Sequence, residues 1–172
     1  LILSAGSKVQ LVRAFKAAAG LHDAKVLTAD LDPVCAAGLF ADEHVSVLRT
    51  DVPDAADELR TLCETRDIGL IVPTRDGELP FLAAMANDLL RAGTRVLVPD
   101  LETLTVCQNK RLFSDAIQQA GLQAIPRVDP DNHAFPMVVR PETGAAGRGT
   151  YKLSEPQDLP DPRHRAGLLF HP

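Results

Sequence analysis

The sequence predicts an α/β fold in which an open parallel sheet is followed by a smaller α+β part. Over residues 1–98, short apolar runs alternate with longer segments of helical periodicity. Such alternation is typical of parallel strands joined by right-handed crossovers. The pattern then changes to two consecutive helices and, from Pro126, to a strand-like and turn-rich segment. With 45% hydrophobic and 24% charged residues, the 172-residue chain can bury a core.

The elements of the first part follow from these runs. Apolar runs predict strands at residues 1–3, 25–28, 44–48, 70–72 and 95–98. Apolar residues at helical spacing predict helices at residues 8–19, 33–40, 54–66 and 78–91. Asp54 is expected to cap the third of these helices. Leu82 and Leu90 lie on the predicted inner face of the fourth, and Gly93 is expected to end it.

The second part begins with two helices. Asp100 is expected to cap a short helix at 101–106, and a helix at 110–120 carries an apolar stripe that includes Leu112 and Phe113. A hairpin of two strands then follows, and residues 168–170 predict one more strand. The predicted division is a sheet domain at 1–100, linking helices at 101–124 and a truncated subdomain at 125–172.

Composition excludes several classes of protein. A net charge of −5 argues against a general nucleic-acid or membrane-surface binder, and no apolar run approaches the roughly 20 residues of a membrane helix. The three cysteines are far apart and form no CxxC pair, which suggests neither a zinc site nor a disulfide framework. We therefore expect free thiols in a cytoplasmic protein.

The strongest chemical signal is the hairpin at residues 135–153. Its first strand ends at Arg140 and leads into a loop that contains Arg148 and three glycines, Gly144, Gly147 and Gly149. Glycine allows the backbone to approach phosphate oxygens, and N–H groups and guanidinium groups then meet the charge. Lys110, at the start of an upstream helix, adds a cation. Together they fit a triphosphate, although a glycine-rich turn can also be a plain loop and Arg148 a solvated side chain.

Weaker signals lie at the ends of strands in the first part. Ser4 and Gly6 follow the first strand, and the fourth is followed by Thr74, Asp76 and Glu78. The carboxyl edge of an open sheet is where ligands bind. The alternative is that Asp76 and Glu78 simply begin a helix. The segment around Ser4 lacks the full GxGxxG spacing, so a dinucleotide site is not supported.

Several of these motifs resemble one known superfamily. Two segments resemble the start of an ATP-grasp domain. They are Asn109-Lys110-Arg-Leu-Phe, and Phe135-Pro-Met-Val-Val-Arg-Pro with the following Gly-Ala-Ala-Gly-Arg-Gly. Two earlier segments resemble the Rossmann-like domain that precedes the ATP-grasp domain in that superfamily. They are Ser4-Ala-Gly-Ser and Ile71-Val-Pro-Thr-Arg-Asp-Gly-Glu-Leu. The similarity spans essentially the whole chain and is greatest to the carbamoyl-phosphate-synthase-like branch of carboxylate–amine ligases.

The resemblance implies an ATP-dependent ligase. Such enzymes use ATP and Mg²⁺ to activate a small carboxylate as an acyl phosphate, which an amine or similar nucleophile then attacks. By position, Lys110 and Arg140 match the phosphate-contacting basic residues. The matching phosphate loop, expected to close over ATP, comprises Gly144, Ala145, Ala146, Gly147, Arg148 and Gly149. The resemblance also implies that the strand-edge residues face the carboxylate substrate; they are Ser4, Gly6, Thr74, Asp76 and Glu78.

The resemblance also implies that this chain is the incomplete N-terminal portion of such a ligase and is inactive alone. The magnesium ligands and the adenine-binding hinge of the superfamily would lie beyond Pro172. Members of the superfamily assemble as dimers and larger forms, so a homodimer is one candidate assembly. A non-catalytic nucleotide-binding or interaction module with a degenerate ATP-grasp fold is the alternative. A nicotinamide- or sugar-nucleotide-dependent Rossmann enzyme is disfavoured, because the second glycine loop lies between strands.

Overall fold

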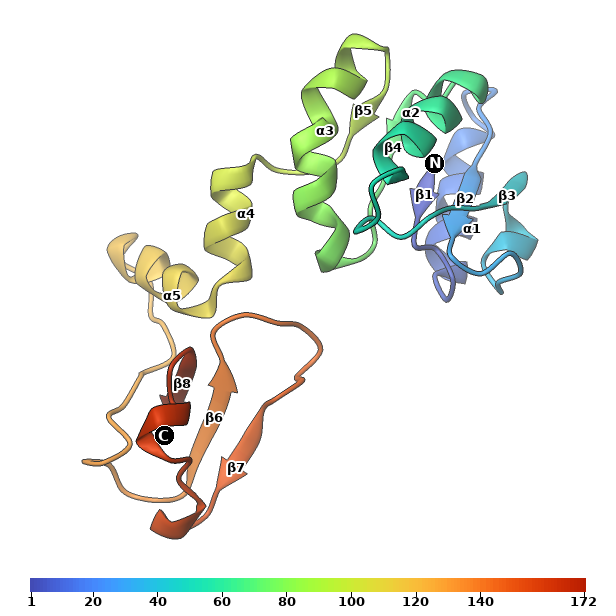
Figure 1. Ribbon diagram of the computed structural model, residues 1–172. Coiled ribbons are helices and arrows are strands. Elements are labelled where there is room, and N and C mark those ends of the chain that lie inside the picture. The colour runs from blue at the N-terminus through green and yellow to red at the C-terminus, as the bar shows by residue number, and fades with distance from the viewer. The chain divides into compact units, whose positions relative to one another are not determined.

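The computed structural model describes residues 1–172, which is the whole chain, and the chain divides into two compact units (Figure 1). The first unit is Leu1–Leu101 and the second is Glu102–Pro172. None of the helices is long and apolar enough to cross a membrane.

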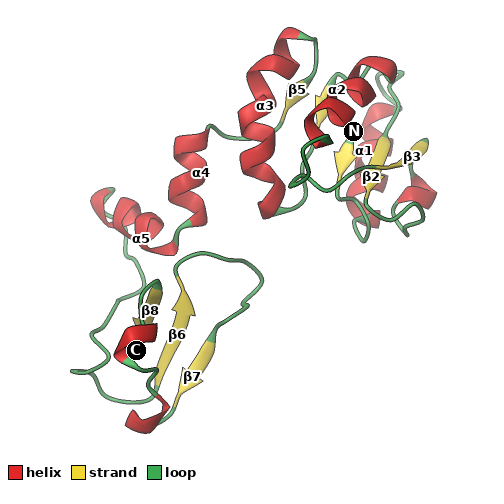
Figure 2. Cartoon of the chain, in the orientation of Figure 1, coloured by secondary structure: helices red, strands yellow, loops and turns green.

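The first unit contains the predicted open parallel sheet (Figure 2). Its strands are β1 (Ile2–Leu3), β2 (Leu27–Asp30), β3 (Glu43–Ser46), β4 (Leu70–Ile71) and β5 (Arg95–Val96). Strands pair in parallel in the orders β1-β2-β3 and β4-β5. Backbone hydrogen bonds from Leu3 N–H to Val72 O (3.0 Å) and from Val72 N–H to Leu1 O (2.8 Å) join the two groups. All carboxyl ends of these strands therefore reach one edge.

Three predicted helices of the first unit form, and one does not. The helices are α1 (Val9–Ala19), α2 (Ala55–Thr65) and α3 (Leu79–Arg91), with short 3₁₀ turns η1 (Gly38–Phe40) and η2 (Asp76–Glu78). The predicted helix at 33–40 is wrong, because only η1 is helical there. Local bonds compete with helix formation: Asp32 Oδ1 accepts from Val34 N–H (3.1 Å), and Cys35 Sγ accepts from Gly38 N–H (3.3 Å).

Two apolar clusters cover the two faces of this sheet. Leu3 belongs to one cluster with Leu59, Ile71 and Leu82, whereas its neighbour Ile2 belongs to the other with residues of α1. Successive residues of a strand point to opposite faces, which explains the division.

Two predictions about these helices are corrected. Leu90 is 53% exposed, and the buried residues of α3 are Leu82, Met85 and Leu89, which follow the 3.6-residue period more closely. Asp54 occupies the N-cap position of α2, but its side chain makes no capping hydrogen bond. Its backbone already has helical angles, φ −83° and ψ −5°, whereas a capping side chain normally projects from extended backbone.

The second unit is built on a small antiparallel sheet. Its strands, in the order β7-β6-β8, are β6 (Met137–Pro141), β7 (Tyr151–Leu153) and β8 (Leu168–His171). Helices α4 (Leu101–Gln108) and α5 (Lys110–Gln119) precede the sheet, and turns η3 (Pro156–Asp158) and η4 (Pro162–His164) lie between β7 and β8. The core of this unit is formed by Met137, Val139, Leu153 and Phe170.

The predicted apolar stripe of α5 is not buried. Leu112 and Phe113 are 40% and 45% exposed, and the buried residue of the helix is Ser114. Polar contacts at the first turn fix the rotation of α5: Lys110 N–H donates to Glu142 O (2.8 Å), and Arg111 pairs with the Glu142 carboxylate. These contacts turn the face of α5 that carries Ser114 toward the core and leave the face that carries Leu112 and Phe113 exposed.

Candidate functional site

The loop between β6 and β7 has a backbone conformation that suits glycine. Positive φ angles occur at Gly144 (106°), Ala146 (57°), Gly147 (70°) and Gly149 (72°). Left-handed backbone costs an ordinary residue about 1–2 kcal/mol, and glycine avoids this cost. At Gly149 a Cβ would also lie 3.3 Å from Pro141 Cγ. The glycines therefore determine the path of this loop.

The backbone N–H groups of this loop are open to a ligand. Residues 143–147 donate no hydrogen bond to any acceptor of the chain, and the first internal bonds are from Arg148 N–H to Ala145 O (3.3 Å) and from Thr150 N–H to Gly147 O (3.1 Å). The loop is exposed from Thr143 onward, so these donors are solvated. A run of successive free N–H groups in a turn can surround an anion.

The first turn of α5 holds the loop from one side. Asn109 caps the helix, since its Oδ1 accepts from Arg111 N–H (2.9 Å) and Leu112 N–H (3.1 Å). Lys110 Nζ donates to Gly144 O at 2.9 Å. Arg111 Nε donates to Glu142 Oε1 (2.6 Å), and this hydrogen bond holds the pKa of Glu142 below its usual value. The structure thus brings Lys110 and the glycine loop together.

Arg140 is near the loop, but its side chain is engaged elsewhere. It is half-buried at the end of β6, and its Nε donates to Nε2 of His171 at 3.0 Å. His171 was not among the residues singled out from the sequence. Arg148 is an exposed side chain of the loop itself. Lys110, Arg140 and Arg148 therefore belong to one unit: Arg140 and Arg148 lie on the β6–β7 hairpin, and Lys110 of α5 contacts its loop.

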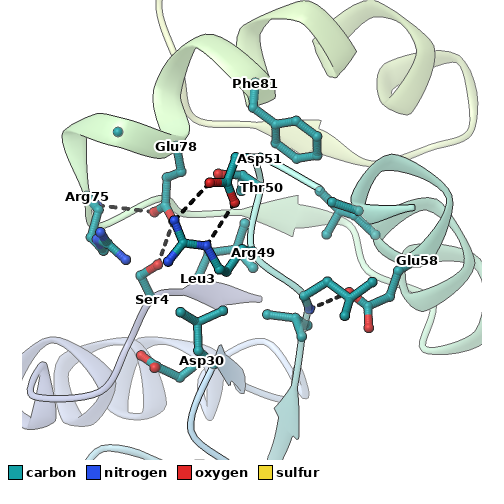
Figure 3. Close-up of a pocket in the computed structure, with 16 residues that line it drawn as sticks. Leu3, Ser4, Asp30, Arg49, Thr50, Asp51, Glu58, Arg75, Glu78 and Phe81 are labelled. Atoms are coloured by element: carbon teal, nitrogen blue, oxygen red, sulfur yellow. Dashed lines mark hydrogen bonds and ion pairs between the residues drawn. The ribbon is translucent and has the colours of Figure 1, made fainter. Parts of the chain in front are cut away.

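The first unit contains a pocket of about 240 Å³ at the carboxyl edge of its sheet (Figure 3). Its apolar lining includes Leu3, Leu59 and Phe81. Carboxylates and guanidinium groups also line it, contributed by Asp30, Asp51, Glu58, Glu78, Arg49 and Arg75. The two arginines were not predicted as site residues. Arg75 stands in the quoted motif after the fourth strand, and this position was the signal that could have indicated it.

Glu78 organises one side of this pocket. It is only 5% exposed and accepts hydrogen bonds from Ser4 Oγ–H (2.6 Å), Thr74 N–H (2.8 Å) and Arg75 N–H (3.1 Å). The Thr74 hydroxyl donates in turn to Ser4 O (2.8 Å). The structure therefore brings together Ser4, Thr74 and Glu78, and Ser4 and Glu78 line the pocket.

The remaining two predicted edge residues lie apart from the pocket lining. Gly6 donates its N–H to Asp30 Oδ2 (2.8 Å), and a Cβ on Gly6 would be 3.0 Å from this oxygen. Gly6 therefore allows a close approach that holds the Asp30 carboxylate at the edge. Asp76 is exposed at the start of η2.

The chain contains no cluster of three or more His, Cys, Asp or Glu side chains that could hold a metal ion. Two features are candidates for ligand binding: the β6–β7 loop with Lys110 beside it in the second unit, and the mixed-charge pocket of the first unit.

Solved structures share the fold of most of this chain. Pyruvate carboxylase T882A from Rhizobium etli, with acetyl coenzyme A, matches with a TM-score of 0.69 at 17% identity, over 99% of this chain and 18% of that one. The biotin carboxylase domain of 2-oxoglutarate carboxylase from Hydrogenobacter thermophilus, a dimer in complex with MgADP, ADP and bicarbonate, matches with a TM-score of 0.68 at 16% identity, over 99% and 43%.

N5-carboxyaminoimidazole synthetase from Staphylococcus aureus, complexed with ADP, gives a TM-score of 0.63 at 17% identity, over 91% of this chain and 41% of that one. This chain thus spans less than half the length of each of these proteins. Their shared fold is the one that the ATP-grasp resemblance predicts, and the predicted fold class is confirmed.

A family model described as the PylC-like N-terminal domain matches residues 1–97, which is more than half of the chain. The matched segment holds the whole parallel sheet and the pocket at its edge. The chain therefore belongs to the PylC-like N-terminal domain family.

Proposed function

We propose that this chain supplies the first domain and the phosphate-binding hairpin of an ATP-dependent carboxylate–amine ligase. One observation carries the proposal: Lys110 Nζ lies 2.9 Å from Gly144 O in a loop whose N–H groups at 143–147 have no acceptor in the chain. The guanidinium groups and open amides of the hairpin, with the ammonium group of Lys110 in contact with its loop, suit a polyphosphate.

Each residue has a distinct part in this proposal. Lys110 would exchange its contact with Gly144 O for a phosphate oxygen, and Arg140 would offer its terminal nitrogens at the strand end. The loop Gly144–Gly149 would fold over the phosphates as a lid and exclude water. Arg148 would add a contact only when the lid is closed.

Magnesium is part of the proposed reaction. A bound Mg²⁺ would neutralise charge on the transferred phosphoryl group in the complete ligase. In this proposal Lys110, Arg140 and the β6–β7 loop make phosphate contacts, and none of them is assigned as a metal ligand. Related folds support nucleotide binding, since the 2-oxoglutarate carboxylase domain was solved with MgADP and the synthetase with ADP.

We assign the carboxylate substrate to the pocket at the sheet edge. Arg49 and Arg75 line it, and a guanidinium group is the usual partner of a carboxylate. Arg49 is already paired with Asp51 through Nε–Oδ1 (2.9 Å) and Nη2–Oδ2 (2.8 Å), whereas the Arg75 side chain makes no such pair. Arg75 is therefore the residue that we expect to meet the substrate, with Ser4 and Glu78 beside it.

Release of ADP tests the activity. In the protein that contains this chain, ADP release should require Mg²⁺ and an added small carboxylate, and bicarbonate and amino acids are the first acids to try. Binding of ATP without such turnover would favour the alternative of a non-catalytic nucleotide-binding module. Oxidation of NADH in the absence of ATP would contradict both. The sedimentation coefficient, measured in the same preparation, tests the proposed homodimer.

A further inference from the structure

We propose that His171 is a positioning residue that aims Arg140 at the phosphates of the bound nucleotide. The inference rests on the proposed function, because it assumes that Arg140 contacts phosphate. His171 ends β8, next to β6, and the register places Val138 opposite His171 and Arg140 opposite Leu169. Arg140 and His171 are therefore diagonal neighbours on one face of the sheet, within reach of long side chains.

The hydrogen bonds of His171 define its protonation state. Its Nδ1 lies 2.7 Å from Pro126 O, and its Nε2 lies 3.0 Å from Arg140 Nε. A carbonyl oxygen can only accept, so Nδ1 must carry a proton; the arginine Nε–H can only donate, so Nε2 must be bare. The arrangement requires a neutral imidazole with its proton on Nδ1.

This pairing orients the guanidinium group. The hydrogen bond uses Nε of Arg140 and leaves both terminal nitrogens for a ligand. His171 is itself only 5% exposed and is fixed at its other nitrogen by Pro126, so it is a rigid anchor. An arginine held at Nε has the orientation of its planar guanidinium group fixed and loses less conformational entropy when it binds phosphate.

The charges around His171 make the pairing sensitive to acid. Burial lowers the pKa of His171 below its ordinary value, the Pro126 carbonyl opposes this shift, and the charges of Arg140 and Arg127 lower the pKa further. Arg140 comes from β6, and Arg127, which is paired with Asp115 of α5, from the segment before β6. A proton on Nε2 would remove the acceptor of Arg140 and place two cations together.

Two variants with amide side chains separate the two bonds of His171. His171→Gln keeps an acceptor at the position of Nε2, toward Arg140. His171→Asn keeps a donor for Pro126 O but does not reach Arg140. At pH 7.5 we expect His171→Asn to weaken ATP binding about tenfold and His171→Gln less than about threefold, since a hydrogen bond to a charged group is lost only in the first.

Affinity as a function of pH gives a second readout. The terminal phosphate of ATP also gains a proton in the acid range, so the ratio of wild-type to His171→Gln affinity is the quantity to follow. We expect this ratio to fall as pH drops below the ordinary histidine value of about 6.5. A ratio that is constant with pH would overturn the positioning role.

Nitrogen NMR tests the contact without any nucleotide. The Arg140 Nε–H signal, assigned by its absence in Arg140→Lys, should be protected from exchange at pH 7.5 in the wild type and lost in His171→Asn. The ring nitrogens should show the Nδ1–H tautomer. A proton on Nε2 at this pH would overturn the inference.

Comparison of Arg140→Ala with the two His171 variants distinguishes a phosphate contact by Arg140 from its positioning by His171. If Arg140→Ala leaves ATP affinity unchanged, Arg140 is not a phosphate contact, and both proposals about it are overturned. If Arg140→Ala weakens binding while both His171 variants bind like the wild type, only the positioning by His171 is overturned.

Discussion

At the scale of single residues, the cations of the hairpin differ in how they are held. Arg140 is anchored by His171, whereas Arg148 is exposed on the loop. Arg140→Ala should therefore weaken ATP binding by about 1.5–3 kcal/mol, the range for hydrogen bonds to charged groups, and Arg148→Ala by much less. Calorimetric titration of both folded variants measures the difference. Equal losses would show that anchoring has no role.

Glu78 supports a second prediction, which concerns stability. Its carboxylate accepts three hydrogen bonds, and Glu78→Ala would leave the N–H groups of Thr74 and Arg75 without this acceptor. An unsatisfied buried donor costs about 1–3 kcal/mol, so urea unfolding should show a first unit that is less stable by at least this amount. Glu64→Ala, on the exposed face of α2, is the matched control and should have almost no effect. An unchanged midpoint in Glu78→Ala would contradict the role of its hydrogen bonds.

The sequence indicated some site residues and not their partners. Lys110, Arg140 and the glycines carry recognisable residue types in a recognisable order. His171 and Glu142 act through bonds to residues about 30 positions away, and sequence spacing contains no information about such pairs. Arg49 was missed for the same reason, because β3 brings it to the pocket edge only after the sheet has formed.

At the scale of elements, the conformation of the β6–β7 loop leads to a prediction about Gly147. An added Cβ would meet no atom within 4 Å, but φ is +70°. In Gly147→Ala the free loop should relax from this conformation, and ATP binding would have to restore it. The variant should therefore lose about 5- to 30-fold in ATP affinity, for a cost of 1–2 kcal/mol. Gly69→Ala is the control, since its surroundings are equally open and its φ is not positive. The same affinity in both variants would mean that ATP does not require the left-handed loop.

The elements themselves were predicted with uneven success. Strong periodicity located α1, α2 and α3 to within a few residues, because their apolar faces cover a sheet. The segment 33–40 failed because Asp32 and Cys35 offer the backbone local hydrogen bonds. The stripe of α5 failed because polar contacts at Lys110 and Arg111 determine which face of the helix turns inward. Periodicity predicts that a helix exists, and tertiary contacts decide its rotation.

At the scale of the whole molecule, the alternation of strands and helices was sufficient to predict the first unit. Right-handed crossovers allow few arrangements of parallel strands, and the observed neighbours β1, β2 and β4 follow from them. The second unit was less predictable, because its sheet pairs β6 with both β7 and β8 across a polar, proline-rich stretch. The fold can therefore be predicted from the sequence pattern where strands and helices alternate regularly, as they do in the first unit.

The overall charge leads to a final prediction about salt. The chain has a net charge of −5, which repels ATP at long range, whereas Lys110, Arg140 and Arg148 attract it at contact distance. Long-range repulsion is screened almost completely beyond a Debye length of about 8 Å at physiological salt. If the hairpin cations bind the phosphates, affinity should fall a few-fold when sodium chloride is raised from about 0.05 to 0.3 M, because contact attraction then dominates.

The opposite result is equally informative. Affinity that rises with salt would mean that the net negative charge governs the encounter, and the hairpin would then not be the binding site. In Arg148→Ala the decrease in ATP affinity with rising salt should be smaller than in the wild type. The exposed guanidinium group of Arg148 is the most easily screened of the three cations. Salt screens the half-buried Arg140 least, so its contribution to ATP binding should persist at every salt concentration. Arg140→Ala lacks this contribution and should therefore bind ATP weakly throughout.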